Sequence, residues 1–309
     1  MKIISLLPSA TEIIVDLGLA SNLVGISHAC DWPPEAMHLP RVTNCVVPKN
    51  SSSHEIDSVV RSELEKNSAL YELDIEKISS LSPDIIMTQA LCDVCAVNGE
   101  DVEKAICNLQ GPTQIVNLEP FTLNEVLDTL TMLGEATNTC ENAANIRQQY
   151  EERIHKIYSL TDKEVSYRPK TIVLDWIDPP FISGHWMHDL ITLAGGEDIM
   201  GTPKSPSWTA KWDQIHDLSP EVLFIACCGY DIEQTLFEIK RSSAKPELDI
   251  LKKTNCKIHI VDGNALYSRP SLRLIDSLEL MAHLLHPSVH QRYAVRGVSN
   301  PILTEHLWS

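Results

Sequence analysis

The sequence lacks long apolar runs and any excess of positive charge, and each absence excludes a large class of protein. No stretch approaches the ~18 apolar residues that a membrane-spanning helix requires, so no membrane insertion is expected. Lys and Arg number 25 against 42 Asp and Glu, and the net charge of −17 disfavours nucleic acid as a partner. The first apolar run meets Pro8 too early for the core of a signal peptide, so no leader is expected.

Signatures of catalysis are also missing. The sequence contains no G-x-S-x-G, no G-x-G-x-x-G, no P-loop and no H-E-x-x-H motif. No catalytic residue is therefore predicted. A binding protein is favoured over an enzyme, although enzymatic activity stays open.

The cysteines indicate a reducing environment. Nine are present, which is an odd number, and Cys227 and Cys228 are adjacent. Neither feature suits a small domain held together by disulfides. The predicted location is therefore the cytoplasm.

Short apolar runs alternate with amphipathic segments along most of the chain. With 309 residues, 43% of them hydrophobic, the chain is long enough for two domains. The alternation predicts an α/β fold with mainly parallel, doubly wound sheets. Ser9 and Glu12 have the spacing of a capping box at the start of the first helix. The expected strands are residues 2–7, 23–27, 84–88, 114–118, 171–176, 222–226 and 257–261, and the expected helices are residues 10–17, 55–66, 74–81, 99–109, 122–137, 187–194, 232–241 and 272–285.

A longer helix is predicted near the middle of the chain. Residues 141–163 contain no proline or glycine, and Ile146, Tyr150, Ile154 and Ile157 form an apolar stripe at helical spacing. Strand-rich sequence restarts at residue 170, so we interpret the helix as a connection between two lobes; packing within one lobe is the alternative. The predicted domains are an N-terminal lobe (1–137), the connecting helix (138–168), a C-terminal lobe (169–286) and a tail (287–309).

The loops that follow the predicted strands are rich in polar and aromatic side chains. In open parallel sheets, ligands bind outside the carboxyl ends of the strands, where these loops lie. A bulky, partly apolar ligand with polar edges requires such a wall, although core packing is the commoner role of any single tryptophan. The predicted ligand-binding residues are Ser9, Gln89, Trp176, Phe181, Trp186, Trp208, Tyr230, Asp262, Asn264, Tyr267 and Arg269.

One of these loops concentrates several kinds of polar group. Residues 262–270 read DGNALYSRP and supply a carboxylate, an amide, a phenol and a guanidinium. In one interpretation Asp262 and Arg269 pair with each other. In the other they hydrogen-bond the rim of a ligand.

A C-x-x-C pair, Cys92 and Cys95, indicates a possible metal site. Zinc requires two further ligands, and His28 and Cys30 lie in the loop after a neighbouring predicted strand. The set His28, Cys30, Cys92 and Cys95 suits zinc, iron or another soft metal. Two alternatives stay open: inert buried thiols, or thiols that act in redox chemistry or touch a ligand directly.

Four segments, taken in order, resemble the cobalamin and iron-siderophore substrate-binding proteins, which are class III periplasmic-binding-protein-like. The segments are ISLLPSATE at 4–12, SPDIIMT at 82–88, DPPFISG at 178–184 and AGGEDIM at 194–200. The resemblance spans residues 2–286. The segments at 27–31, 89–96 and 262–270 are similar to a leaderless subgroup labelled cobalamin-binding.

The resemblance implies two Rossmann-like lobes joined by one rigid helix, with a ligand held in the cleft between them. It favours Phe181, Trp208, Asp262, Tyr267 and Arg269 as ligand contacts. The expected function is a soluble binding protein for a corrinoid such as cobalamin, or for another metal chelate. The alternative is a metal- or thiol-dependent enzyme, or a metal carrier, that uses the Cys/His cluster. Secreted relatives deliver their ligand to a membrane ABC transporter, and the lack of a leader argues against such docking here.

Overall fold

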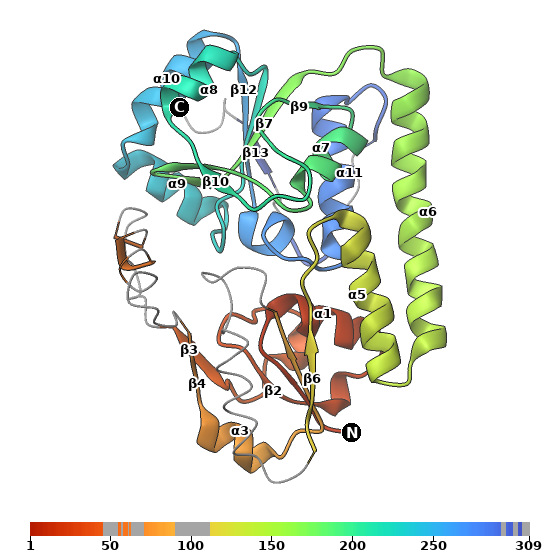
Figure 1. The fold of residues 1–309 in the computed structure, drawn as a ribbon. Helices are drawn as coiled ribbons and strands as arrows, with labels where there is room; N and C mark the ends of the chain where they lie inside the picture. The colour runs from red at the N-terminus through yellow and green to blue at the C-terminus, as the bar shows by residue number, and fades with distance from the viewer. Residues whose placement is uncertain are drawn as a thin grey trace. The chain divides into compact units, whose positions relative to one another are not determined.

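The computed structural model describes residues 1–45, 55–56, 58–60, 62, 71–89, 112–291, 295–298 and 302–304. These residues form two compact units, and both are α/β, which confirms the predicted fold class (Figure 1). Unit 1 comprises Met1–Pro120 and Leu127–Arg147, and unit 2 comprises Phe121–Val126 and Gln148–Ser309.

Unit 1 is built on a four-stranded parallel sheet. Its strand order is β2 (Leu23–Ile26), β1 (Ile3–Ser5), β5 (Ile85–Thr88) and β6 (Gln114–Asn117). β1 and β5 are almost wholly buried, which explains why they read as unbroken apolar runs rather than as alternating patterns. A separate antiparallel pair is formed by β3 (Thr43–Cys45) and β4 (Tyr71–Leu73).

The first helix corrects the predicted capping box. α1 (Pro8–Asp16) begins two residues earlier than expected, and its N-cap is Leu7, which makes no side-chain cap. Proline at the first helical position needs no hydrogen bond there, so Pro8 starts the helix. Ser9 and Glu12 are instead buried within α1.

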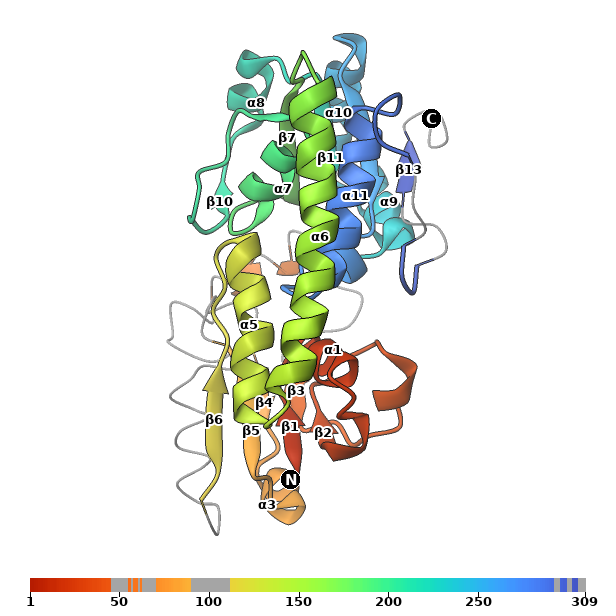
Figure 2. The same ribbon diagram turned by 90° about the vertical axis from the view of Figure 1, so that its right-hand side faces the viewer.

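Local contacts explain where α3 begins and how α5 and α6 approach one another. α3 (Ile75–Leu81) starts at Asp74, whose Oδ1 accepts a hydrogen bond from the Lys77 backbone N–H at 3.0 Å. α5 (Leu123–Ala136) and α6 (Cys140–Glu164) pack closely where Gly134 meets Ala143, since a Cβ on Gly134 would lie 2.6 Å from the Ala143 Cβ. Figure 2 shows the two helices side by side along this stretch.

The long helix predicted over residues 141–163 is α6, and it is unbroken. Its residues up to Arg147 belong to unit 1 and those from Gln148 onward to unit 2, so the observed division falls inside the helix. Its role as a rigid connection stays a prediction, as do the predicted domain limits.

Unit 2 has a sheet with a parallel centre and antiparallel edges. The centre consists of β7 (Lys170–Ile177), β11 (Val222–Ile225) and β12 (Lys257–Val261). On one side, β8 (Pro180–Ile182) and β10 (Trp208–Thr209) follow β7; on the other, β13 (Ile302–Thr304) pairs with β12. A short strand, β9 (Glu197–Asp198), pairs with the start of β7. These edge strands are two or three residues long, too short to produce a readable periodicity.

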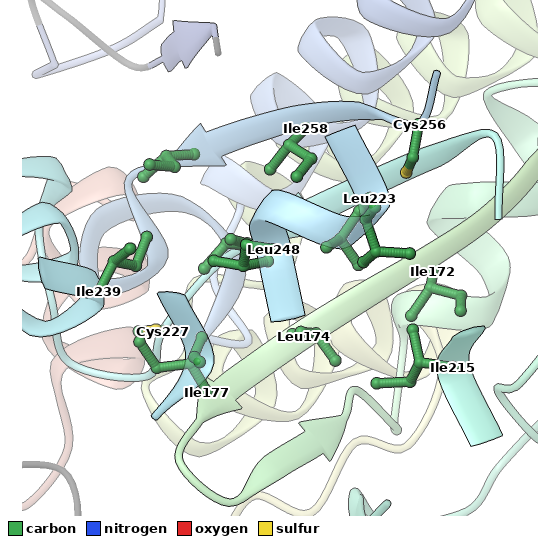
Figure 3. Close-up of a cluster of buried hydrophobic side chains, with 14 of the residues drawn as sticks. Ile172, Leu174, Ile177, Ile215, Leu223, Cys227, Ile239, Leu248, Cys256 and Ile258 are labelled. Atoms are coloured by element: carbon green, nitrogen blue, oxygen red, sulfur yellow. The ribbon is translucent and has the colours of Figure 1, made fainter. Parts of the chain in front are cut away.

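Helices cover both faces of this sheet. α8 (Trp212–Leu218), α9 (Ile232–Arg241) and α10 (Ala244–Lys253) lie on one face, and α7 (Met187–Leu193) and α11 (Arg273–Leu285) lie together on the other (Figure 1). Figure 3 shows the core on the first face, where Ile172, Leu174 and Leu223 of the sheet meet Ile215, Ile239 and Leu248 of the helices. All six are fully or almost fully buried, and truncating one such side chain to alanine costs about 2–5 kcal/mol.

Helix α10 was not expected from the sequence, and two expected helices lie wholly or mostly outside the described residues. The sequence did not indicate α10, because Pro246 lies within it, near the N-terminus where proline is tolerated. The expected helix at 99–109 lies outside the described residues, and that at 55–66 lies mostly outside them. Within the described ranges, no helix is both long and apolar enough to cross a bilayer.

Candidate functional site

The carboxyl ends of β7, β11 and β12 meet at one edge of the unit 2 sheet because these strands are parallel. We call this the unit 2 edge. It comprises residues 175–186, 205–209, 228–230 and 262–269, and most of the predicted ligand-binding residues lie there.

Four aromatic side chains gather at the unit 2 edge. The rings of Trp176 and Tyr230 lie 5.1 Å apart, centroid to centroid. Trp176 is paired across the strands with Phe181, and β10 places Trp208 opposite Ile182, next to Phe181. Trp208 is 36% exposed, and the other three are half-buried. The four side chains thus lie on neighbouring strands and loops of this edge, with Trp176 in ring contact with Tyr230 and Trp208 one register position from Phe181. We call these four residues the aromatic surface.

The loop after β12 adds polar groups to the same edge. Asp262 Oδ1 accepts from the Ala265 N–H at 2.8 Å, and Arg269 Nη2 donates to Asn264 Oδ1 at 2.7 Å. The Asn264 N–H donates to the Tyr230 carbonyl at 3.0 Å, which ties this loop to the aromatic surface. Burial raises the pKa of Asp262, and its hydrogen bond from Ala265 opposes that shift.

Two predicted site residues are almost fully buried. Trp186 and Tyr267 are 5% and 2% exposed. Trp186 Nε1 donates to the Tyr267 carbonyl at 2.9 Å, and the Tyr267 hydroxyl donates to the Ser277 carbonyl at 3.2 Å. Burial raises the pKa of the Tyr267 phenol. These contacts give both rings a packing role, Trp186 against the 262–269 loop and Tyr267 against α11, and their contact with a ligand stays a prediction.

A half-buried carboxylate at this edge was not predicted from the sequence. Asp175 lies in β7, and its Oδ2 accepts from the Ser207 hydroxyl at 2.5 Å. Burial raises its pKa to about 6, while hydrogen bonds from Ser207 and Ser183 act in the opposite direction. The sequence does contain one indication of this residue, because Asp175 is the single acidic residue in the apolar run TIVLDWI.

The carboxyl edge of the unit 1 sheet holds small polar groups. The Thr11 hydroxyl donates to Ser5 Oγ at 2.9 Å and lies 3.2 Å from the Cys30 Sγ. Ser9 and Gln89 are 3% and 8% exposed. The predicted ligand contacts Ser9 and Gln89 thus lie in this unit, mostly buried, and stay predictions.

Half of the predicted metal site can be described. His28 Nδ1 lies 2.7 Å from Thr43 Oγ1, and burial, assisted by Arg41, lowers the His28 pKa and so favours the neutral ring. A neutral imidazole is the metal-binding form. Cys92 and Cys95 lie outside the described residues, within which no group of three or more His, Cys, Asp or Glu could hold a metal ion. The four-ligand site stays a prediction.

A cavity of about 560 Å³ lies at the opposite, amino edge of the unit 2 sheet. Tyr167, Glu221, Lys257 and His286 are among its lining residues. Glu221 Oε2 already accepts from the Tyr167 hydroxyl at 2.5 Å and from the Lys170 N–H at 3.0 Å. This cavity is remote from the strand ends where α/β sheets bind ligands, so the unit 2 edge is the better candidate.

Comparison with known proteins gives a consistent picture. The sequence profile of the family described as "Periplasmic binding protein" matches residues 3–254. A vitamin B12-binding protein of Vibrio cholerae is 26% identical over 226 residues, which cover 72% of this chain and 69% of that protein. One from Yersinia pestis is 22% identical over 229 residues, which cover 73% and 69%.

Solved structures share the fold. The periplasmic vitamin B12 binding protein BtuF of Vibrio cholerae aligns with a TM-score of 0.66 at 21% identity, covering 93% of this chain and 96% of that one. A periplasmic heme-binding protein from Pseudomonas aeruginosa aligns with a TM-score of 0.72 at 15% identity, covering 98% and 97%.

Proposed function

This chain belongs to the periplasmic binding protein family, and from that premise we propose that it binds a corrinoid such as cobalamin at the unit 2 edge. The observation that carries the proposal is the aromatic surface of Trp176, Phe181, Trp208 and Tyr230. Aromatic side chains offer large apolar contact area together with polar edges, which suits a broad macrocycle. The relatives described as vitamin B12-binding proteins support the same ligand class.

The polar groups beside the aromatic surface favour a corrinoid over haem. The rim of a corrin carries carboxamide groups, which both donate and accept hydrogen bonds, whereas haem carries two carboxylates. Asp262 places a carboxylate at the edge, and the Arg269 guanidinium already donates to Asn264. A carboxylate-bearing ligand would meet Asp262 as a like charge, while a carboxamide could donate to it.

Calorimetric titration of the full chain with cyanocobalamin and, separately, with haemin tests this proposal. We expect saturable binding of cyanocobalamin at one site per chain and weaker binding of haemin. Trp208→Ala should weaken cobalamin binding, while Tyr158→Ala, which removes an exposed ring on α6, serves as the matched control. No heat of binding with cyanocobalamin at tens of micromolar protein would contradict the proposal.

The metal alternative has its own measurement. Zinc or iron at one ion per chain, in protein purified without chelator, would support the set His28, Cys30, Cys92 and Cys95. Loss of that ion in a Cys92→Ala/Cys95→Ala variant would locate it there. Metal content unchanged by this variant would exclude these cysteines as ligands.

For the location of the protein we propose the cytoplasm. Six cysteines among the described residues are free thiols, and of these Cys45, Cys140 and Cys228 are exposed. Exposed thiols persist in a reducing compartment. Labelling in intact cells with a thiol reagent that does not cross membranes should leave these cysteines unmodified, and their modification would contradict the proposal.

A further inference from the structure

Asp175 occupies an irregular position in β7. Leu174 is paired with Ile182 and Trp176 with Phe181, so β7 has one more residue than β8 along this stretch. The extra residue is Asp175. Such β-bulges redirect a side chain and are frequent beside functional sites. The bulge therefore gives this carboxylate a direction that regular pairing would not.

The Asp175 carboxylate is bound to the segment that carries Trp208. The Ser207 hydroxyl donates to Asp175 Oδ2 at 2.5 Å and accepts from the Gly184 N–H at 3.1 Å. Ser207 thus joins β7, the loop after β8 and the start of β10. A hydrogen bond to a charged group is about twice as strong as one between neutral groups.

The backbone before Trp208 lies directly against Gly184. A Cβ on Gly184 would lie 2.4 Å from the Ser205 carbonyl oxygen and 2.5 Å from the Ser207 nitrogen. The His185 N–H donates to that Ser205 carbonyl at 2.7 Å. Residues 205–207 therefore pack directly against the loop after β8. The Ser207 side chain adds a hydrogen bond from this segment to Asp175 in β7.

Trp208 lies in a short, exposed edge strand that, among the described strands, is paired only with β8. β10 contains only Trp208 and Thr209, and both are exposed. Residues 202–204, which precede the segment, are exposed as well. A two-residue edge strand buries too little surface to hold an exposed ring in place alone. Ser207, one residue before Trp208, provides a side-chain hydrogen bond to the central strand β7.

We propose that Asp175 is a positioning residue of the ligand site, and that it fixes Trp208 through the Ser207 hydroxyl. The idea rests on the proposed function in one respect, since Trp208 is taken as part of the ligand-binding surface. Without the hydrogen bond from Ser207 to Asp175, the Trp208 ring and the residues before it would be less ordered in the free protein. Ligand binding would then have to order them, and this loss of conformational freedom lowers affinity.

The experiment uses full-length protein labelled with 5-fluorotryptophan, in which the ¹⁹F resonance of Trp208 is assigned by its absence in Trp208→Phe. We expect Ser207→Ala to shift or broaden the Trp208 resonance in ligand-free protein and to raise the Kd for cyanocobalamin about 5-fold. Ser207→Thr keeps the hydroxyl and should behave like the wild type. Ser205→Ala, in the same segment, is the matched control, since its hydroxyl reaches only the Pro203 carbonyl at 3.4 Å.

The role of Asp175 is tested by a double-mutant cycle. If Asp175 acts through Ser207, Asp175→Asn should change little once Ser207→Ala is present. Additive effects of the two substitutions on the Trp208 resonance would overturn the proposal, as would an unchanged resonance in Ser207→Ala. Absence of cyanocobalamin binding by the wild type would refute the proposed function alone, because the resonance of the ligand-free protein still reports on positioning.

Discussion

The carboxyl edges of the two parallel sheets differ in chemistry, although both units are α/β. In unit 1 the described edge carries hydroxyls and a thiol, represented by Ser5, Thr11 and Cys30, in short contacts with one another. In unit 2 the edge carries a half-open aromatic surface with Asp175 and Asp262 beside it. The same layer architecture thus carries two edges of different chemistry, and function follows from the side chains rather than from the fold.

The two units also differ in the ion pairs that arginines of α6 make within them. In unit 1, Arg147 reaches Asp128, a half-exposed carboxylate, at 2.7 Å. In unit 2, Arg153 reaches Asp276 at 2.5 Å and Glu279 at 2.8 Å, both of them buried on α11. Burial opposes the charge of Arg153, but Glu279 and Asp276 outweigh it and raise the Arg153 pKa. At these two pairs, α6 is bound to buried carboxylates in unit 2 and to a half-exposed one in unit 1.

The largest expected effect comes from breaking this buried network. Arg153→Ala leaves two buried carboxylates without their shared guanidinium, which should lower the free energy of unfolding by about 3 kcal/mol. Arg147→Ala, the matched control on the same helix, should cost less than about 1 kcal/mol because the carboxylate it leaves behind, Asp128, is half-exposed to water. Urea denaturation followed by circular dichroism measures both. Equal losses would show that the two pairs are energetically alike.

The next effect concerns affinity at the unit 2 edge. Trp208→Ala should raise the Kd for cyanocobalamin about 30-fold, equivalent to about 2 kcal/mol, as is common for a central aromatic contact. The melting temperature should change less than the affinity, because Trp208 lies at the surface in an edge strand and outside the buried core. Calorimetry and differential scanning measure the two quantities. Unchanged affinity in this variant would remove Trp208 from the binding surface.

A smaller effect is a dependence of stability on pH through Asp175. Its folded pKa, about 6, exceeds the ordinary value of 3.8. The protonated form is therefore favoured by folding, and its contribution is complete below about pH 4 and lost as the pH rises through 6. We expect this loss to be about 2 kcal/mol between pH 4 and 7.5 in the wild type and absent in Asp175→Asn. Urea midpoints between pH 4 and 7.5 measure the difference, and parallel curves would contradict it.

The smallest effect is expected at the unit 1 edge. Thr11→Val removes a hydroxyl that reaches Ser5 Oγ, the Leu7 carbonyl and Cys30 Sγ. A neutral hydrogen bond contributes about 1 kcal/mol, so stability should fall by that amount. Cobalamin affinity should be unchanged. A large loss of affinity would show that the unit 1 edge takes part in binding and would remove the contrast between the edges.

Much of the candidate site could be predicted from the sequence because its residues follow recognisable strands. Trp176, Phe181, Tyr230 and Asp262 each lie just beyond a run of apolar residues, and parallel strands bring such positions to one edge. Trp186 and Tyr267 satisfied the same rule, yet they are buried and linked by a hydrogen bond. Position in a loop after a strand therefore does not tell an exposed aromatic ring from a buried one.

The sequence by itself determined the α/β class, the central strands and the extent of α6, because apolar periodicity and the absence of helix breakers act locally. The tertiary structure alone decided the bulge at Asp175, the addition of β10 beside β8 and the link from Asp175 to Ser207. The last two contacts join residues about 30 positions apart, and all three involve edge strands too short to carry a pattern. Their geometry arises only when the sheet assembles, since a residue in an edge strand takes its surroundings from its neighbour in space.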